Sequence, residues 1–245
     1  MKQNYRNWLE EQKYAPGTIT AQLHRVGRVE DLYGSLDDLI SNGTFQDVID
    51  ELNYTTEDAR ANRPNPSKLI VDGNIRNNLQ SYKNAVLRYQ RFLNGTDRIF
   101  TESEDEVVVA AGELAVAAEY VSQKLSLERD MQAALRRNIT SLKPTLAIID
   151  DGAERSVFSG FIDITCVDSE DDSLVVVELK AGKADSRAIG QILGYMGDLA
   201  EEEDRPVRGI LVANEFDKRT RSAAKVVPTL TLIGYAIEFR FTQES

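Results

Sequence analysis

The sequence predicts an α/β protein with an all-helical N-terminal half and a C-terminal half built on a mixed central β-sheet. Through the first 95 residues, apolar side chains recur at the three- and four-residue spacing of amphipathic helices. After residue 145, short apolar segments typical of strands alternate with helical segments. We place the domain boundary near residue 100, after Asn94-Gly95 and before an acidic linker at 101–106, which gives domains at 1–100 and 101–245.

The helical half contains three main apolar stripes. A short first helix carries Trp8 and Leu9, and a second helix begins at Pro16-Gly17. Helical spacing continues at 36–52 and at 74–94, and the sequence RANRPNP at 60–66 is expected to be a loop between them.

The C-terminal half is expected to begin with helices and continue as strands. The turn pair Asp151-Gly152 predicts a hairpin between the first two strands, and LVVVELK is apolar enough for a strand covered on both faces. The expected helices are 113–123, 127–140, 185–202 and 216–226, and the expected strands are 145–150, 155–167, 174–180, 206–213 and a pair near 229–241.

Composition excludes several classes of site. The 245 residues carry 29 basic and 40 acidic side chains, a formal charge of −11, with a single cysteine and a single histidine. Disulfides within the chain, cysteine-rich zinc sites and histidine-pair metal motifs are therefore excluded. The sequence has no apolar run of the roughly 18 residues needed to span a membrane and no apolar signal segment, so we expect a cytoplasmic protein without a membrane partner.

Charged residues in the central apolar strand indicate a site. Glu178 and Lys180 share one strand face, and Asp163 lies amid apolar neighbours in the preceding strand. If these strands pair, the two carboxylates come close together, and a cation between them would relieve their repulsion. Oxygen ligands favour Mg²⁺ or Mn²⁺. The alternative, a structural Glu–Lys pair at a strand end, stays open.

These residues resemble the PD-(D/E)XK nuclease signature, in which Asp163 is followed by Glu178-Leu179-Lys180. Four blocks in order, LERD at 127–130, SGFIDI at 159–164, LVVVELKAGKA at 174–184 and GQILGYM at 190–196, resemble the C-terminal nuclease domain of NucS (EndoMS) endonucleases. The resemblance implies a restriction-endonuclease-like fold, metal ligation by Glu128, Asp163 and Glu178, a catalytic Lys180, and Gln191 and Tyr195 completing the site. Gln191 and Tyr195 also share one helical face, because they are four residues apart.

The function that this resemblance implies is metal-dependent hydrolysis of phosphodiester bonds in DNA, in repair or in defence against foreign DNA. The helical half differs from the β-rich N-terminal domain of NucS enzymes and is weakly similar to the SAM-like core-binding domain of tyrosine recombinases. Recombination is not expected, because residues 101–245 contain no histidine. The tail carries no sliding-clamp peptide pattern, and a homodimer stays open. A non-catalytic DNA-binding adaptor and an RNA-directed nuclease remain alternatives.

Phosphate contacts are expected mainly from a basic stretch at 60–98, which has eight basic residues against Asp72 and Asp97. The alternative for this stretch is a solvated helix face. The residues proposed to contact nucleic acid are Arg76, Lys83, Arg88, Arg91, Lys183 and Arg187.

Overall fold

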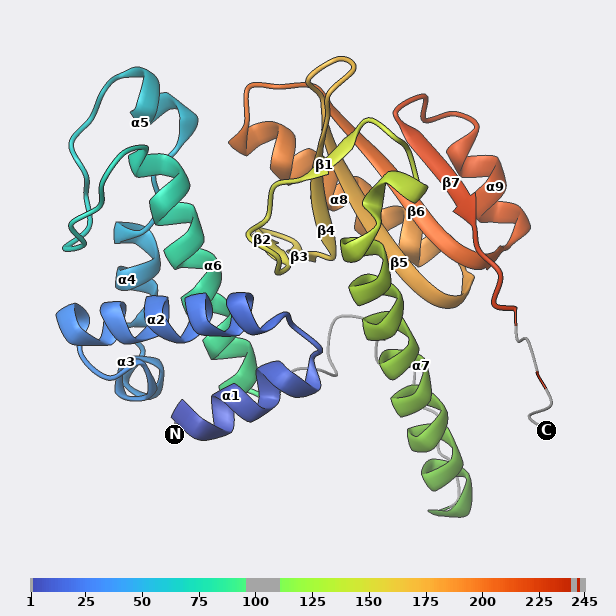
Figure 1. Ribbon diagram of the computed structural model, residues 1–245, viewed down its shortest axis with the longest axis horizontal. Helices are drawn as coiled ribbons and strands as arrows, with labels where there is room; N and C mark the ends of the chain where they lie inside the picture. Colours follow the sequence, from blue (N-terminus) through green and yellow to red (C-terminus); the bar gives the residue numbers. More distant parts are fainter. Residues whose placement is uncertain (1, 96–110, 239–241, 243–245) are drawn as a thin grey trace.

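The computed structural model describes residues 2–95, 111–238 and 242 (Figure 1). The boundary predicted near residue 100, the acidic linker at 101–106 and residues 239–241 lie outside the described residues. Of the pair of strands predicted near 229–241, the described residues contain one strand, at Leu230–Gly234, and residues 235–238 are not in a strand. Of the helices in the described residues, none is both long and apolar enough to cross a membrane.

The N-terminal part is helical, as the sequence predicts (Figure 1). Its described helices are α1 (Lys2–Glu11), α2 (Pro16–Tyr33), α3 (Leu36–Asn42), α4 (Phe45–Glu51), α5 (Thr56–Arg60) and α6 (Ile75–Leu93). Helix α6 begins where the Asn74 side chain accepts the backbone N–H of Asn77, which satisfies one of the unpaired donors of the first turn. Its buried stripe, which includes Leu79, Val86 and Tyr89, packs into the helical core.

The predicted helical run at 36–52 is divided in two. Gly43 ends α3 with a φ of 81°, in the left-handed region that glycine adopts without steric cost, and α4 begins two residues later. The two helices predicted at 113–123 and 127–140 are instead one long helix, α7 (Ala111–Arg137), followed by the short 3-10 helix η1 (Ile139–Ser141).

The C-terminal part contains a mixed sheet, which confirms the predicted fold class. In the described residues its strand order is β1-β4-β5-β6-β7, with β5 antiparallel to β4 and parallel to β6. The elements are β1 (Leu146–Ile148), β2 (Arg155–Val157), β3 (Gly160–Ile162), β4 (Ile164–Asp168), β5 (Leu174–Ala184), α8 (Ser186–Glu202), β6 (Val207–Phe216), α9 (Lys218–Ala224) and β7 (Leu230–Gly234).

The prediction of one continuous strand at 155–167 is wrong. It is divided into β2, β3 and β4, and β2 pairs with β3 as a separate two-stranded hairpin. The partner of β1 is β4, which begins only after the hairpin. Asp151-Gly152 does form a turn with positive φ at both residues, but it leads into this inserted hairpin rather than into the next strand of the sheet.

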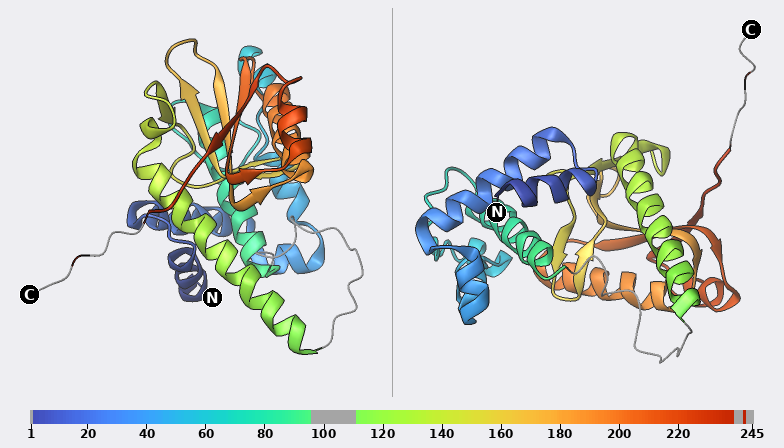
Figure 2. Two further views of the ribbon diagram at one scale, coloured as in Figure 1. Left: turned by 90° about the vertical axis from the view of Figure 1, so that its right-hand side faces the viewer. Right: turned by 90° about the horizontal axis from the view of Figure 1, so that it is seen from below.

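Strand β5 is the middle strand of the sheet, and other elements cover both of its faces. Val176 packs in the core that includes α8, whereas Val175, Val177 and Leu179 pack in the core that includes residues of α7. Figure 2 shows α7 and α8 on opposite sides of the sheet. Burial on both faces explains the nearly continuous apolar sequence of residues 174–179. The strand continues to Ala184, beyond the predicted end at 180, so the charged Glu178 and Lys180 lie within it.

The β2–β3 hairpin joins the two parts of the molecule. Ser156 in β2 donates both its N–H and its hydroxyl to Asn84 Oδ1 in α6, at 3.2 and 2.6 Å. Ala153, just before the hairpin, is buried in the core of the helical part. Arg76 in α6 also pairs with Glu203, which follows α8, at 2.6 Å. The helical part therefore packs directly against the segment that leads to Asp163.

Candidate active site

The antiparallel pairing of β4 and β5 brings Asp163 and Glu178 together. Ile164 lies opposite Val177, so Asp163 and Glu178 occupy the next positions of the register. Asp163 Oδ2 accepts a hydrogen bond from the backbone N–H of Leu179 at 2.8 Å, which fixes this carboxylate against the middle of β5. The proximity expected from the sequence, which depended on the two strands pairing, is therefore present.

Both carboxylates are held in an environment that disfavours their charge. Burial, and then the negative charge of Glu178, raise the pKa of Asp163 well above its ordinary value. Burial also raises the pKa of Glu178, although Lys180 opposes the shift. Glu178 Oε2 is buried and has no hydrogen-bond partner. An orphaned buried oxygen beside a second carboxylate is suited to a cation, which would neutralise both groups.

Lys180 connects the carboxylates to α8. Its Nζ lies 3.0 Å from Glu178 Oε1 and donates to Gln191 Oε1 at 2.9 Å. Gln191 in turn donates to the Tyr195 hydroxyl at 2.8 Å. Burial raises the pKa of Tyr195 to about 12, with the charge of Glu178 adding to the shift. The predicted set of Lys180, Gln191 and Tyr195 is thus brought together as one hydrogen-bonded row.

The ammonium of Lys180 is held in its charged form. Burial acts to lower its pKa, but the negative charges of Glu178 and Asp163 outweigh burial and raise the pKa above its ordinary value. A charged ammonium is a hydrogen-bond donor and a positive charge.

Glu128 reaches the same part of β5 from α7 but in a different way. Its Oε1 accepts the backbone N–H of Ala181 at 2.9 Å, and its negative charge adds to the raised pKa of both Asp163 and Glu178. In the described part of the chain, no three His, Cys, Asp or Glu side chains are grouped closely enough to hold a metal ion. The predicted trio of Glu128, Asp163 and Glu178 therefore does not converge on one point here.

A cavity of about 560 Å³ opens above these groups. Asp163, Glu178, Lys180, Gln191 and Tyr195 line it from the sheet and α8. The C-terminal end of α6 also lines it, through Leu87, Gln90, Arg91 and Asn94, and the β2–β3 hairpin contributes Ser156, Val157, Phe158, Ser159, Gly160 and Phe161. The sequence did not indicate that helix α6 forms a wall of this site.

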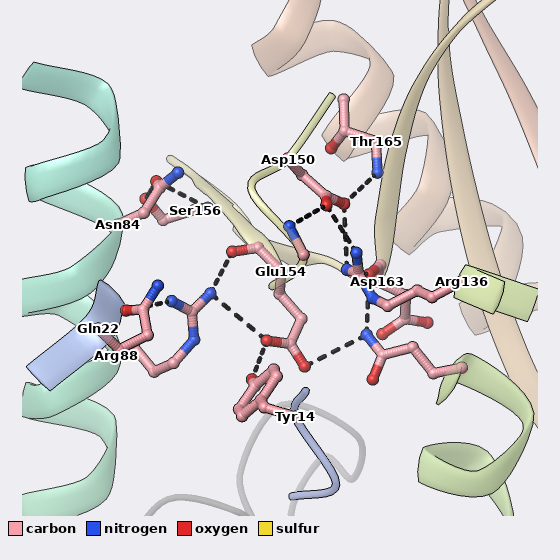
Figure 3. Close-up of polar contacts among 12 residues, drawn as sticks. Tyr14, Gln22, Asn84, Arg88, Arg136, Asp150, Glu154, Ser156, Asp163 and Thr165 are labelled. Atoms are coloured by element: carbon pink, nitrogen blue, oxygen red, sulfur yellow. Dashed lines mark hydrogen bonds and ion pairs between the residues drawn. The ribbon is translucent and has the colours of Figure 1, made fainter. Parts of the chain in front are cut away.

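A buried polar cluster anchors the main chain at Asp163 (Figure 3). Gln132 and Arg136, both in α7, donate to the Asp163 carbonyl oxygen at 2.8 and 2.5 Å. Gln132 also donates to Glu154 Oε1 at 3.2 Å, and Arg136 makes two bonds to Asp150 at 2.6 and 3.0 Å. The position of Asp163 thus depends on residues that lie behind the cavity.

Glu154 is the centre of this cluster. Its carboxylate accepts from Tyr14 and lies 3.4 Å from Arg88 Nη2, while its carbonyl oxygen also accepts from Arg88 (Figure 3). Burial disfavours its charge, but Arg88, Arg91 and Arg136 outweigh burial and lower the pKa of Glu154 to about 2. Sequence reasoning missed Glu154, because its partners are far from it along the chain and no local pattern marks them.

The predicted nucleic-acid contacts fall into separate groups. Arg88 has no exposed surface, and Arg76 is paired with Glu203 and with the carbonyl oxygen of Glu202. We therefore correct the prediction for these two residues, because both are committed to contacts between the two parts of the molecule. Lys83 is half-buried and donates to Asn53, and burial lowers its pKa.

Three of the predicted basic residues remain at accessible places. Arg91 lines the cavity, and its guanidinium carbon lies 5.2 Å from the centre of the Phe161 ring. Lys183 is exposed, 3.7 Å from Glu215, and Arg187 is exposed in the first turn of α8. These positions are compatible with phosphate contacts.

The segment that carries this site is similar to a known protein family. Residues 127–228 match the family model described as the Endonuclease NucS C-terminal domain. This half of the chain is NucS-like. Endonuclease NucS of Pyrococcus abyssi is 45% identical over 60 residues, which are 24% of this chain and 24% of that protein. Endonuclease NucS of Pyrococcus furiosus is 39% identical over 79 residues, 32% of this chain and 28% of that protein. The chain therefore spans about a quarter of the length of the curated relatives it matches.

Two solved structures are also similar to the chain. A crystal structure of a repair endonuclease from Pyrococcus abyssi is 24% identical, with a TM-score of 0.38 over 54% of this chain and 49% of that chain. A structure titled as an EndoMS-dsDNA2 complex is 23% identical, with a TM-score of 0.39 over 58% of this chain and 52% of that chain. Within the matched segment of this chain, the NucS-like domain contains Glu128, Asp163, Glu178, Lys180, Gln191 and Tyr195.

Proposed function

We propose that this protein is a divalent-metal-dependent endonuclease that hydrolyses phosphodiester bonds in DNA. One observation carries the proposal: Asp163, Glu178 and Lys180 meet in a cavity of the NucS-like domain, with an unpartnered buried oxygen on Glu178. A structural Glu–Lys pair alone does not account for a second buried carboxylate, or for the cavity above it.

Asp163 and Glu178 are the proposed ligands for Mg²⁺ or Mn²⁺, because both are oxygen donors and their mutual repulsion favours a cation between them. A bound divalent cation would supply Lewis-acid chemistry, which polarises the phosphate and makes water more acidic. Glu128 is not one of the two proposed ligands but a carboxylate that lies next to them. Its hydrogen bond from the Ala181 N–H holds α7 against β5 beside the two ligands.

The contacts of Lys180 suit it to act as a positively charged hydrogen-bond donor. As a fixed ammonium, it donates to the attacking water or to a phosphoryl oxygen, and its positive charge stabilises the negative charge that develops there in the transition state. Gln191 Oε1 accepts a hydrogen bond from Lys180 Nζ and so orients the ammonium, and the Tyr195 hydroxyl fixes Gln191 by accepting a hydrogen bond from its amide. Arg91, Lys183 and Arg187 are the proposed phosphate contacts outside this row.

The proposal is tested by incubating the purified chain with end-labelled single-stranded, branched and duplex DNA of one sequence. Each substrate is tested in Mg²⁺, Mn²⁺ and EDTA, with Glu178→Gln as the control for a contaminating nuclease. We expect cleavage that needs the metal and is lost in the variant. RNA of the same sequence is included, because an RNA-directed nuclease would cleave it in preference to DNA. An adaptor would bind DNA but leave every substrate intact.

A further inference from the structure

A second cavity lies behind the buried polar cluster that holds Asp163. Its volume is about 500 Å³, and it opens between α7 and the segment that joins α1 to α2. Arg129 and Arg137 line it from one face of α7, because they are eight residues apart along the helix. Gln132 and Arg136 also line it, and the same two side chains donate to the Asp163 carbonyl oxygen. This space, called the rear cavity below, is large enough for a small ligand.

The charged side chains that line the rear cavity are all positive. They are Lys13, Arg129, Arg136 and Arg137, and no aspartate or glutamate among the described residues lines it with them. This is unusual in a chain that has 40 acidic and 29 basic residues. A concave surface lined by charges of one sign concentrates the electrostatic potential, so the rear cavity should attract anions.

The carboxylates that balance part of this charge lie outside the cavity wall. Asp130 forms an ion pair with Lys13, and Asp150 accepts two hydrogen bonds from Arg136. Arg137 is exposed, and the part of the chain that the structure describes supplies no ion-pair partner for it. A guanidinium without a carboxylate partner is available to an anion, and its planar fork of donors matches two oxygens of a phosphate group.

The first turn of α2 adds main-chain donors to these side chains. Ala15, Pro16 and Thr18 line the rear cavity, and no side chain caps the helix at Ala15. The N–H groups of a first helical turn have no acceptor within the helix, and the helix dipole adds partial positive charge there. Gly152 allows the close approach of this turn, because a Cβ at that position would lie 2.6 Å from Thr18 Oγ1. Backbone and side chains of the rear cavity therefore both favour an anion.

We propose that the rear cavity binds a phosphate group, with Arg137 as a direct contact. Two sources carry such a group, a free polyphosphate and the backbone of a nucleic-acid strand, and the experiment below separates them. The rear cavity is distinct from the proposed catalytic site, because Asp163, Glu178 and Lys180 line the other cavity. Phosphate binding at this place needs neither a metal ion nor hydrolysis, so it is tested independently of the proposed function.

The test compares full-length wild type with Arg137→Gln and Lys124→Gln, all in EDTA. Without metal, the proposed catalytic carboxylates cannot hold a phosphate through a cation. Lys124 is a matched control, because it is exposed on the same helix and lines neither cavity. Affinity for inorganic pyrophosphate is measured by isothermal titration calorimetry. Affinity for single-stranded and duplex DNA is measured by fluorescence anisotropy at several salt concentrations, and melting temperatures check that both variants are folded.

If the source is a free polyphosphate, wild type should bind pyrophosphate, and Arg137→Gln should weaken that binding about tenfold. If the source is a nucleic-acid strand, Arg137→Gln should instead weaken DNA binding and reduce the slope of log affinity against log salt by about one. Lys124→Gln should resemble wild type in both measurements. Absence of binding of both probes by wild type, unchanged binding by Arg137→Gln, or an equal loss in Lys124→Gln would overturn the phosphate site.

Discussion

Arg88 in α6 and Glu154 before β2 form an ion pair, with 3.4 Å between Arg88 Nη2 and Glu154 Oε2, that is buried where the helical part meets the sheet. Gln132 connects this pair to the main chain at Asp163, because its side chain donates hydrogen bonds to both Glu154 and the Asp163 carbonyl oxygen. The helical part is thereby connected to a proposed catalytic carboxylate through two residues.

Breaking this pair should cost more stability than breaking a surface pair. Arg88→Met leaves Glu154 buried without its closest positive charge, and we expect the free energy of unfolding to fall by about 3–5 kcal/mol. Glu154→Gln combined with Arg88→Met should cost less than the sum of the two single changes, because neither partner is then left as an unpaired charge. Denaturant unfolding of the four proteins measures this coupling.

The matched control for that cycle is Lys183→Met. Its Nζ lies 3.7 Å from Glu215 Oε1, and both side chains are exposed. The free energy of unfolding should therefore fall by less than about 1 kcal/mol. Equal losses for Arg88→Met and Lys183→Met would show that the buried pair does not stabilise the junction.

The titration of Glu154 should also make the free energy of unfolding depend on pH. Its pKa in the folded protein is about 2, below its ordinary value of 4.5, because Arg88, Arg91 and Arg136 favour the charged form against the cost of burial. The folded state therefore binds fewer protons than the unfolded state, and the stabilisation is present above about pH 4.5 and lost as the pH falls toward 2. The difference between the two pKa values corresponds to about 3 kcal/mol in the free energy of unfolding.

Unfolding in denaturant at several pH values between 6 and 2 tests this dependence. The wild-type protein should lose about 3 kcal/mol more than Glu154→Gln over this range, because the amide cannot titrate. Parallel curves for the two proteins would exclude Glu154 as the source of the pH dependence.

Removing one of the two crowded carboxylates should stabilise the protein without metal. Asp163→Asn keeps an oxygen that accepts the Leu179 N–H but removes a negative charge beside Glu178. We expect a higher melting temperature in EDTA and no further rise with Mn²⁺, whereas wild type should be stabilised by Mn²⁺ through binding to the folded state.

Glu128→Gln is the matched control for this measurement. It keeps an acceptor for the Ala181 N–H and leaves Asp163 and Glu178 in place, so most of the Mn²⁺ stabilisation should remain. If Mn²⁺ has no effect on wild type, the proposed ligand pair is wrong. If Glu128→Gln loses the whole effect, Glu128 is a required ligand.

The sequence predicted the arrangement of a few candidate residues but not the connections around them. Alternation along β5 is enough to place Glu178 and Lys180 on one face. The proximity of Asp163 depends on the pairing of β4 with β5, which the sequence left as a condition. The β2–β3 hairpin was missed because its residues read as the start of one long strand. The contacts that distinguish these residues are made with other elements, Asn84 in α6 and Asp198 in α8.

For the basic residues, the sequence did not predict which side chains are buried and which are accessible. Arg88 and Arg91 are three residues apart on α6, yet Arg88 is fully buried against Glu154 and Arg91 lines the cavity. Positive charge in a sequence does not reveal whether a buried acid from another segment will pair with it. The contact that decides the role of Arg88 is made 66 residues away along the chain.

The most direct test of the central claim is single-turnover DNA cleavage by wild type and Lys180→Ala in Mg²⁺ or Mn²⁺, with affinity measured separately. Lys180 acts on charge that develops in the transition state, so the variant should bind DNA within a few-fold of wild type and cleave it about 10²–10³ times more slowly. Lys180→Arg should restore only part of the rate, because a planar guanidinium does not replace a compact ammonium between Glu178 and Gln191. Equal cleavage rates in wild type and Lys180→Ala, or no metal-dependent cleavage by wild type, would contradict the account.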